Sequence, residues 1–304
     1  MLFTAAADLH ITNKTPTNRK GDYFSQVIDK FEFILNLSEN TDSKVLVVAG
    51  DFFDSAQVSY KITRRVLESI QKSDVRILAI SGQHDVRYHG LSLDNTPLGI
   101  LQTAKAIQIL KPDSTIEING ISFMGCSWGE EPKIEADVLV MHLMVTKKGE
   151  LWPGQTNYST AHSILRKYQF AQCIISGDNH LPHALRVDNR IQINPGSMLR
   201  STKSQINHQP RVYQINTSDW SFKKIKIPIL PAEEVFDFSK ITIEEMKDES
   251  KKIAEEKIKN FINTLPKNER EKPNFINILQ NVIEQTKPND AVKKIIASTI
   301  EEIS

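Results

Sequence analysis

Short apolar runs that end in glycine and polar residues are the main pattern of this chain. The clearest run is Val45–Ala49, which is followed directly by Gly50 and Asp51. An uninterrupted run of aliphatic residues predicts a strand buried on both faces, as in a sheet covered by helices. Further runs also end at carboxylate, imidazole or amide side chains: Leu2–Ala7, Val75–Ile80, Val138–Val140 and Cys173–Ser176.

Amphipathic stretches alternate with these strands. Apolar residues recur at helical spacing in residues 22–38 and 59–71, and Leu98–Ala106 predicts a short helix. Alternating strands and helices indicate crossover connections and therefore an α/β fold. Asn119-Gly120 predicts a hairpin between Ile116–Ile118 and Ile121–Met124. Later strands are expected to form a second sheet that completes a sandwich: Ala184–Val187, Ile191–Ile193 and Val212–Ile215.

The composition changes after Pro228 and Pro231, where lysine and glutamate become frequent. We therefore expect two parts, a sandwich domain at residues 1–231 and a helical region at 232–304. The helices expected in the second part are Ile241–Leu265, Phe275–Thr286 and Asp290–Ile303.

Composition excludes some classes of function. The 304 residues carry a formal net charge of +1, so no global basic field indicates a polyanion partner. No window suggests a signal peptide or a membrane span, which favours a cytoplasmic protein without a membrane partner, in a host cytoplasm if the chain is phage-encoded. Residues 179–230 are nevertheless basic, and a phosphate-binding role and a generic solvated face explain these cations equally well: Arg186, Arg190, Arg200, Lys203 and Arg211.

The strand ends supply a set of candidate metal ligands. Strand alternation places Asp8 and His10 on the same side, and Asp178 repeats this spacing with His180. The carboxyl ends of strands in one sheet converge on one crevice, which would also bring together Asp51, Gln83, His84 and His142. Oxygen and imidazole donors without thiolates suit Mn²⁺, Fe²⁺, Zn²⁺ or Mg²⁺. Even without His84, the seven remaining candidates are too many for one ion, so two ions about 3.5–4 Å apart, bridged by one carboxylate, are expected.

These motifs resemble those of a known family. In order, Asp8-x-His10, Gly50-Asp51-x-x-Asp54, Gly82-Gln83-His84-Asp85, His142 and Gly177-Asp178-x-His180 are similar to the five motifs of the calcineurin-like metallophosphoesterases. The resemblance implies a four-layer α/β sandwich of two mixed sheets flanked by helices, here with a C-terminal helical appendage. Within that superfamily, residues 8–12, the Gly-Asp-Phe-Phe-Asp form and the turn Asn194–Ser197 resemble SbcD-type DNA repair nucleases, of which several phage and bacterial members share Gly-Gln-His-Asp.

The resemblance also implies roles for the candidate residues. The first ion would be held by Asp8, His10, Asp51 and His180, and the second by Asp51, Gln83, His142 and Asp178. His84 would protonate the leaving oxygen or stabilise the developing charge, and Asp85 would orient its ring. The chain departs from the usual pattern at Gln83, where the family has Asn, and at Asp178, where it has His. The added anion favours hard ions, so Mn²⁺ is expected, with Mg²⁺ or Fe²⁺ as alternatives.

The expected function is two-metal hydrolysis of phosphodiester bonds in DNA, by an exonuclease or endonuclease in repair or recombination. The implied partners are DNA and an SbcC-type coiled-coil ATPase that would dock on the C-terminal helices, and a homodimer remains open. Two other hypotheses stand beside it. One is a phosphoesterase acting on a phosphoprotein or cyclic nucleotide, and the other is a scaffold that uses its pocket and helical tail only to bind partners.

Overall fold

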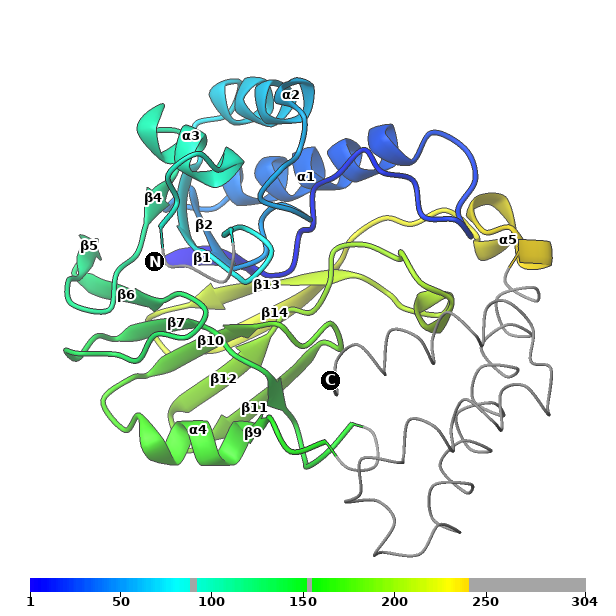
Figure 1. The fold of residues 1–304 in the computed structure, drawn as a ribbon. Helices are drawn as coiled ribbons and strands as arrows, with labels where there is room; N and C mark the ends of the chain where they lie inside the picture. Colours follow the sequence, from blue (N-terminus) through cyan, green and yellow to red (C-terminus); the bar gives the residue numbers. More distant parts are fainter. Residues whose placement is uncertain (88–91, 152–154, 241–304) are drawn as a thin grey trace, which may run out of the picture. The chain divides into compact units, whose positions relative to one another are not determined.

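The computed structural model describes residues 1–87, 92–151 and 155–240. The chain divides into two compact units, Met1–Phe238 and Ser239–Ser304. The description below concerns the first unit, whose helices and strands are labelled in Figure 1. The three helices expected between residues 241 and 303 lie outside the described residues.

The first sheet contains the N-terminal strands of the chain. Its order is β14 (Ser221–Lys226), β13 (Arg211–Asn216), β1 (Leu2–Ala6), β2 (Val45–Ala49), β3 (Arg76–Ile80) and β4 (Gln108–Ile109). The pairs from β1 to β4 are parallel, whereas β13 joins β1 in antiparallel register, with Ala5 opposite Tyr213. The sheet is therefore mixed, and all its parallel strands end at the same edge.

The second sheet is built from the middle of the chain. Its order is β11 (His183–Val187), β12 (Arg190–Asn194), β10 (Cys173–Gly177), β7 (Val138–His142), β6 (Ile121–Cys126) and β5 (Ile116–Ile118). The predicted hairpin at Asn119-Gly120 joins β5 to β6. A separate two-stranded sheet pairs β8 (Val145–Thr146) with β9 (Ser159–Thr160).

The two sheets pack face to face between layers of helices (Figure 1). Helices α1 (Tyr23–Glu39), α2 (Tyr60–Gln71) and α3 (Pro97–Thr103) cover the first sheet, and α4 (Ala161–Lys167) covers the second. Strand β2 shows why its apolar run is uninterrupted. Leu46 and Val48 pack in the cluster with the helices, while Val45, Val47 and Ala49 pack in the cluster between the sheets. The four-layer sandwich expected from the resemblance is confirmed.

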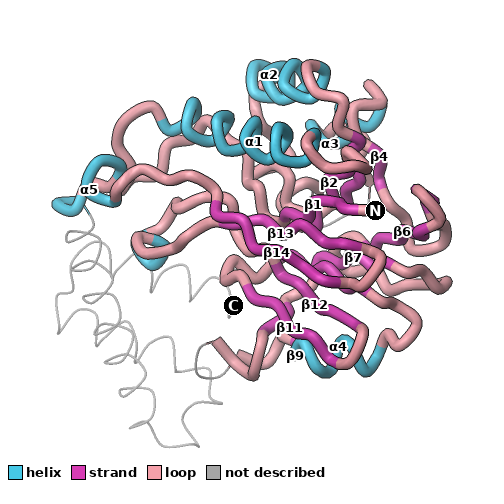
Figure 2. Tube along the Cα trace, turned by 180° about the vertical axis from the view of Figure 1, so that it is seen from behind, coloured by secondary structure: helices cyan, strands magenta, loops and turns pink. Residues whose placement is uncertain are grey.

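The late strands differ from the expectation. Strands β11 and β12 do lie in the second sheet, but the strand predicted at Val212–Ile215 is β13 of the first sheet. Figure 2 shows β13 and β14 beside β1, seen from behind. Strand β14 was not predicted, because its exposed lysines resemble a solvated face. Lysines are typical of an edge strand, where they hinder pairing with other chains.

The first unit continues past the expected boundary at residue 231. Helix α5 (Ala232–Val235) leads to Phe236, which is fully buried and lies under the guanidinium groups of Arg19 and Arg200, 4.9 and 5.6 Å from its ring centroid. Backbone hydrogen bonds from Lys20 to Val235 and from Asp237 to Asn18 hold this segment. Among the described residues, no helix is both long and apolar enough to cross a membrane.

Candidate metal centre

The candidate ligands lie where the strands end, and several have an unusual backbone. Asp8, His10, Asp51 and Asp178 have positive φ angles of 49°, 45°, 47° and 77°. Such left-handed conformations are unfavourable for residues with a Cβ atom, by about 1–3 kcal/mol each, and they cluster at functional sites. The turns after β1, β2 and β10 are therefore strained in a way that brings these side chains together.

Glycine packing leaves room for one of the imidazoles. A Cβ atom on Gly50 would lie 2.2 Å from Nδ1 of His142, and one on Gly177 would lie 2.0 Å from the Ala49 carbonyl oxygen. The buried His142 ring occupies the space that these glycines leave. Its Nδ1 lies 2.8 Å from the Ala49 carbonyl oxygen, which can only accept, so Nδ1 carries the proton. Nε2 therefore presents its lone pair when the ring is neutral.

Asp51 lies at the centre of the site. Its Oδ2 atom is 3.4 Å from Nε2 of His142 and 3.7 Å from Nε2 of His10. Its Oδ1 atom accepts a hydrogen bond of 3.0 Å from the backbone N–H of His84. One carboxylate oxygen thus faces imidazoles from two different strand ends, which is the position a carboxylate shared by two cations requires.

Three side chains form one half of the site. Nε2 of His10 is 3.1 Å from Nε2 of His180, and ligand atoms of both lie within 4.8 Å of a carboxylate oxygen of Asp8. Two nitrogens that are each about 2.1 Å from one ion lie roughly 3 Å apart, so the histidine spacing is that of two ligands of one cation. Asp8 also accepts a 2.9 Å hydrogen bond from the backbone N–H of Asp178, which fixes its Oδ1 atom.

Gln83 and Asp178 contact each other in the other half. Nε2 of Gln83 donates to Oδ1 of Asp178 at 2.8 Å, and the remaining Oε1 atom of Gln83 is buried without a hydrogen-bond partner among the described residues. The amide nitrogen cannot coordinate a cation but the oxygen can. The contact therefore turns the coordinating atom of Gln83 away from Asp178 and leaves it available.

Unpartnered buried atoms test whether these residues fit a metal. Among the described residues, four such atoms face the cluster: Asp8 Oδ2, Asp51 Oδ2, Gln83 Oε1 and His142 Nε2. His10 Nδ1 is buried as well but lies 3.6 Å from Oδ1 of Asp54. An unsatisfied buried polar group is destabilising by about 1–3 kcal/mol, and buried groups of this kind are normally paired. Carboxylate, amide and imidazole atoms gathered without a partner are the donors that divalent cations take. The residues therefore fit a divalent-metal centre.

At neutral pH three groups of the cluster, Asp8, His10 and Asp51, have the protonation state that binds a cation, whereas His142 does not. Burial lowers the pKa of His10 to about 3 despite the nearby Asp51 charge, so the imidazole is neutral. Burial raises the pKa of Asp51, but His142 and His10 outweigh this effect and hold it at about 2. Burial raises the pKa of Asp8 to about 6, against the nearby histidines. Burial lowers the pKa of His142, yet Asp51 and Asp8 reverse this effect and raise it to about 10. The ring is therefore protonated, and a metal would have to displace this proton in order to bind.

The sequence profile of the calcineurin-like phosphoesterases matches residues 1–182. This chain belongs to that family. No curated protein matches it in sequence. An archaeal phosphodiesterase structure is 15% identical, covers 74% of this chain and 99% of its own, and has a TM-score of 0.43. The protein TT1561 of Thermus thermophilus is 8% identical, with 75% and 99% covered and a TM-score of 0.49. Vps29 of Entamoeba histolytica is 13% identical, with 75% and 100% covered and a TM-score of 0.34.

His84 lies at the rim of this phosphoesterase's metal centre. Its ring is exposed and meets the His10 ring edge-on, with 4.9 Å between the centroids. Its Nδ1 atom lies 2.9 Å from the Asp54 carbonyl oxygen and must donate to it. The carbonyl of Asp54 therefore orients the ring and leaves Nε2 for other contacts. Ligand atoms of His10, Asp51 and His84 also lie within 4.8 Å of one another.

The role expected of Asp85 is wrong. Asp85 is fully buried, and its two oxygens accept backbone N–H groups of Phe52, Phe53 and Gly82 at 2.9–3.1 Å. It therefore holds the turn after β3 against the turn after β2 and does not orient the His84 ring. Burial and the Asp51 charge raise its pKa to about 7, against these three hydrogen bonds.

The predicted basic residues are scattered over the fold. Arg190 begins β12, at the end of the sheet opposite to the metal centre. Arg186 lies on β11, where it is paired with Ile191, the residue after Arg190. The guanidinium of Arg200 is buried and donates to the Ile206 and Leu230 carbonyls. Arg186 and Arg190 also donate to backbone carbonyls. Arg211 begins β13, beside the end of β1, and its Nε atom donates to the Gln209 carbonyl, so these four arginines all bind the protein's own backbone. Lys203 begins a short 3-10 helix outside the two sheets.

Sequence reasoning missed the residues that hold the His180 turn. Nδ2 of buried Asn194 donates to the carbonyls of Asn179 and Leu181, at 2.6 and 3.0 Å. The backbone N–H of Ser197 donates to the His180 carbonyl, and that of Met198 donates to the Asp8 carbonyl. The only sequence signal was the Asn-Pro-Gly-Ser turn, which gives no hint of these long-range contacts.

Proposed function

We propose that this phosphoesterase is a two-metal nuclease that cleaves phosphodiester bonds in DNA. The observation that carries the proposal is the position of Asp51, with one carboxylate oxygen 3.4 Å from His142 and 3.7 Å from His10. This arrangement supports two cations that share one carboxylate, with His84 beside them at the rim. Two-metal sites of this form hydrolyse phosphoesters by in-line displacement.

The residues of the site would have separate roles in metal binding and proton transfer. When bound, the divalent ions supply Lewis-acid stabilisation of negative charge on the phosphoryl oxygens and make water a stronger nucleophile at neutral pH. Asp8, His10 and His180 would hold the first, Gln83, His142 and Asp178 the second, and Asp51 both. His84, fixed through Nδ1 by the Asp54 carbonyl, offers Nε2 to the leaving oxygen and delivers a proton to it from the imidazolium form.

We propose DNA as the substrate because the residues that resemble SbcD-type nucleases lie at the candidate metal centre. The turn Asn194–Ser197 contacts the loop of His180, and the next residue hydrogen-bonds to Asp8. The exposed ring of His84 leaves the site open to a long substrate. A phosphoprotein or cyclic nucleotide remains the competing substrate class, and it predicts faster turnover of small phosphoesters than of DNA.

Manganese is the proposed native ion. The donor set contains four carboxylate or amide side chains and three histidines, and Asp178 adds negative charge where the family has imidazole. Hard oxygen donors favour Mn²⁺ or Mg²⁺, with Fe²⁺ as an alternative because of the imidazoles. Phosphodiester turnover by the metal-free protein reconstituted with each ion in turn tests this order, because affinity alone follows the same series at most nitrogen and oxygen sites. Full activity with Zn²⁺ and little activity with Mn²⁺ would contradict it.

The decisive experiment measures Mn²⁺-dependent cleavage of labelled linear duplex and circular single-stranded DNA, beside turnover of a chromogenic phosphodiester. Cleavage of DNA that His84→Ala abolishes without loss of bound metal supports the proposal. Turnover of the chromogenic ester without DNA cleavage, even with the ATPase partner added, means that the metal chemistry stands but the substrate is another one. Loss of both activities with two ions bound would favour the scaffold hypothesis.

An SbcC-type ATPase is the proposed partner, with residues 241–304 as its docking segment. The resemblance to SbcD-type nucleases and the helices expected in this segment support it, and the segment lies outside the described part of the chain. Co-purification of the full chain, but not of a chain ending at Phe238, with the ATPase tests it. Sedimentation of the protein alone decides between a monomer and the homodimer.

A further inference from the structure

Two cavities meet beside His84. The smaller, of about 300 Å³, is lined by Asp54, Gln83 and His84 of the catalytic rim. The larger, of about 1280 Å³, lies between the start of α2 and α3. Ala56, Gln57 and Arg87 line both cavities. The two are therefore parts of one groove that leads from the catalytic rim across the helical face of the first sheet.

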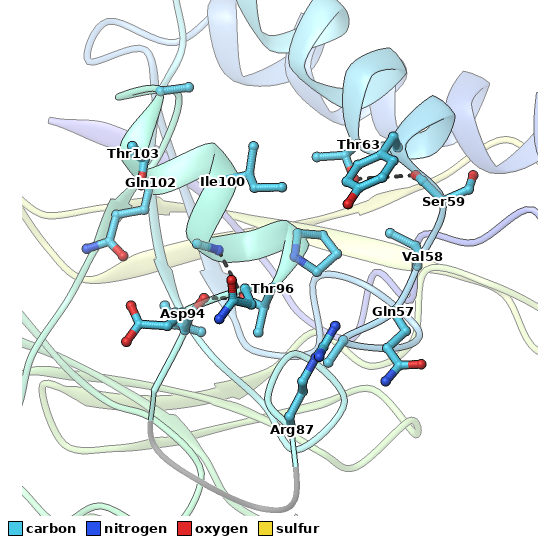
Figure 3. Close-up of a pocket in the computed structure, with 17 residues that line it drawn as sticks. Gln57, Val58, Ser59, Thr63, Arg87, Asp94, Thr96, Ile100, Gln102 and Thr103 are labelled. Carbon is cyan, nitrogen blue, oxygen red and sulfur yellow. Dashed lines mark hydrogen bonds between the residues drawn. The ribbon is translucent and has the colours of Figure 1, made fainter.

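The walls of the larger cavity come from ordered elements. Figure 3 shows Ser59 and Thr63 on the α2 side, Ile100, Gln102 and Thr103 on the α3 side, and Arg87 and Gln57 toward one end. Helix α3 starts at a Thr96 cap, whose Oγ1 accepts from the Gly99 N–H at 3.1 Å. Helix α2 is tied to α1 by the 2.8 Å ion pair of Arg65 and Glu32. Two opposite walls of the groove are therefore held on helices, which favours a binding role, while Gln57 and Arg87 lie on loops.

The lining has a distinct chemistry. Tyr60 is 86% exposed and Ile100 is 42% exposed, although both are large and hydrophobic. Amide groups stand beside them on Gln57, Asn95 and Gln102. Among the described residues that line it, the charged ones are Arg87, at the junction with the catalytic rim, and Asp94.

We propose that this groove binds a single-stranded polynucleotide beside the bond to be cleaved, with a base stacked on Tyr60 and a phosphate held by Arg87. An exposed aromatic ring is a stacking platform for any base, and amides can hydrogen-bond to base edges. Arg87, the only cationic side chain among the described residues that line the groove, lies where the polynucleotide would enter from the catalytic centre. The volume exceeds the roughly 300–1000 Å³ of small-ligand pockets and suits an extended ligand.

This inference rests on the proposed nuclease function and names the part of the substrate that the metal centre does not touch. The groove's near-neutral lining favours bases over a purely electrostatic contact with a duplex backbone. A peptide is the competing occupant, because it too can use amides and an exposed tyrosine. The experiment must therefore separate bases from backbone.

Binding of fluorescently labelled oligothymidylate to the full chain, measured by anisotropy without added metal, tests the groove independently of cleavage. Tyr60→Ala should weaken binding about tenfold, within the range of base–aromatic stacking, while Tyr60→Phe keeps it. Arg64→Ala, which removes an exposed arginine of the same helix outside the groove, is the matched control and should have no effect.

An oligomer with the same phosphates but abasic sugars separates the two contacts. Tyr60→Ala should not change the affinity for this oligomer, because there is no base to stack. Arg87→Ala should weaken the binding of both oligomers equally. It should also reduce the slope of log affinity against log salt concentration by about one unit. Far-ultraviolet circular dichroism and thermal unfolding confirm that each variant is folded.

Two results overturn the inference. One is unchanged oligothymidylate binding by Tyr60→Ala, and the other is competition by an unphosphorylated peptide that displaces the oligomer with the same Tyr60 dependence. Failure of the nuclease proposal gives a different pattern. The wild-type protein would then bind the oligomer in a Tyr60-dependent manner but not cleave it under any metal.

Discussion

The amide of Gln83 donates a 2.8 Å hydrogen bond to the carboxylate of Asp178. These are the two positions at which the chain departs from the usual metallophosphoesterase pattern, and they are 95 residues apart in sequence. The side-chain N–H of the longer glutamine donates to a carboxylate that replaces the usual imidazole, and within the described part of the chain its Oε1 atom has no hydrogen-bond partner. The two departures are therefore in direct contact and act together at the proposed second metal position.

We expect the pair to behave as a unit when it is reverted. Gln83→Asn and Asp178→His should each weaken binding of the second ion, because each removes the contact that aims the remaining partner. The double variant should bind better than the sum of the single changes predicts, with a coupling of about 1 kcal/mol. Calorimetric titration of the metal-free proteins with Mn²⁺ measures this coupling, and strictly additive effects would contradict it.

His84→Ala should lower kcat by about 10²–10⁴-fold without loss of bound metal, since it removes the proton donor and not a ligand. Turnover of the chromogenic ester and metal content by mass spectrometry are the two readouts. His162→Ala, which removes an exposed histidine on α4, is the control. Loss of one ion in His84→Ala would instead make His84 a ligand, alongside His10 and Asp51.

Asp85→Ala should lower the stability of the fold and leave the orientation of the His84 ring unchanged. Three buried backbone N–H groups lose their acceptor, each worth about 1–3 kcal/mol, so the free energy of unfolding should fall by at least about 3 kcal/mol. Urea denaturation measures this change. The exposed Asp113→Ala provides the comparison and should stay within about 0.5 kcal/mol of the wild type. A stable Asp85→Ala protein would refute the structural role.

Gly177→Ala should disturb both stability and the second metal. Its Cβ atom would lie 2.0 Å from the Ala49 carbonyl and 2.8 Å from Nδ1 of His142, so the ring has to move. Gly120→Ala has open space around its Cβ and should show only the left-handed backbone penalty of about 1–2 kcal/mol. Urea denaturation and Mn²⁺ titration of both variants test the difference. Equal effects would mean that the glycine is not required for packing.

Lys30 should make the stability of the first unit depend on pH. Burial, together with Arg19 and Arg200, lowers its pKa from 10.5 to about 7. Between these pH values the unfolded chain binds the proton that the folded chain does not, so the free energy of unfolding rises with pH through this window. Lys30 also donates to the Met198 carbonyl at 3.2 Å.

Lys30→Met should therefore be more stable than the wild type below pH 7, and this difference should shrink as the pH rises toward 10.5. Chemical denaturation at several pH values provides the measurement. Lys224→Met, at an exposed position on β14, should show a constant small difference. A difference between Lys30→Met and wild type that grows with pH would contradict the sign.

The sequence alone determined the long buried strands, the α/β class and the list of residues that meet at the candidate metal centre. It could do so because buried parallel strands leave uninterrupted apolar runs, and because Asp51 and its counterparts follow those runs directly. It placed β13 in the wrong sheet, because strand pairing partners leave no local pattern, and it missed β14, whose exposed lysines resemble a solvated face. It also missed α4, which at 7 residues is too short to show a clear helical period. The tertiary structure decided the roles. Only the folded chain shows that the Asp54 carbonyl orients His84, that Asp85 binds backbone N–H groups, and that Gln83 meets Asp178, because these contacts join residues that lie on different turns.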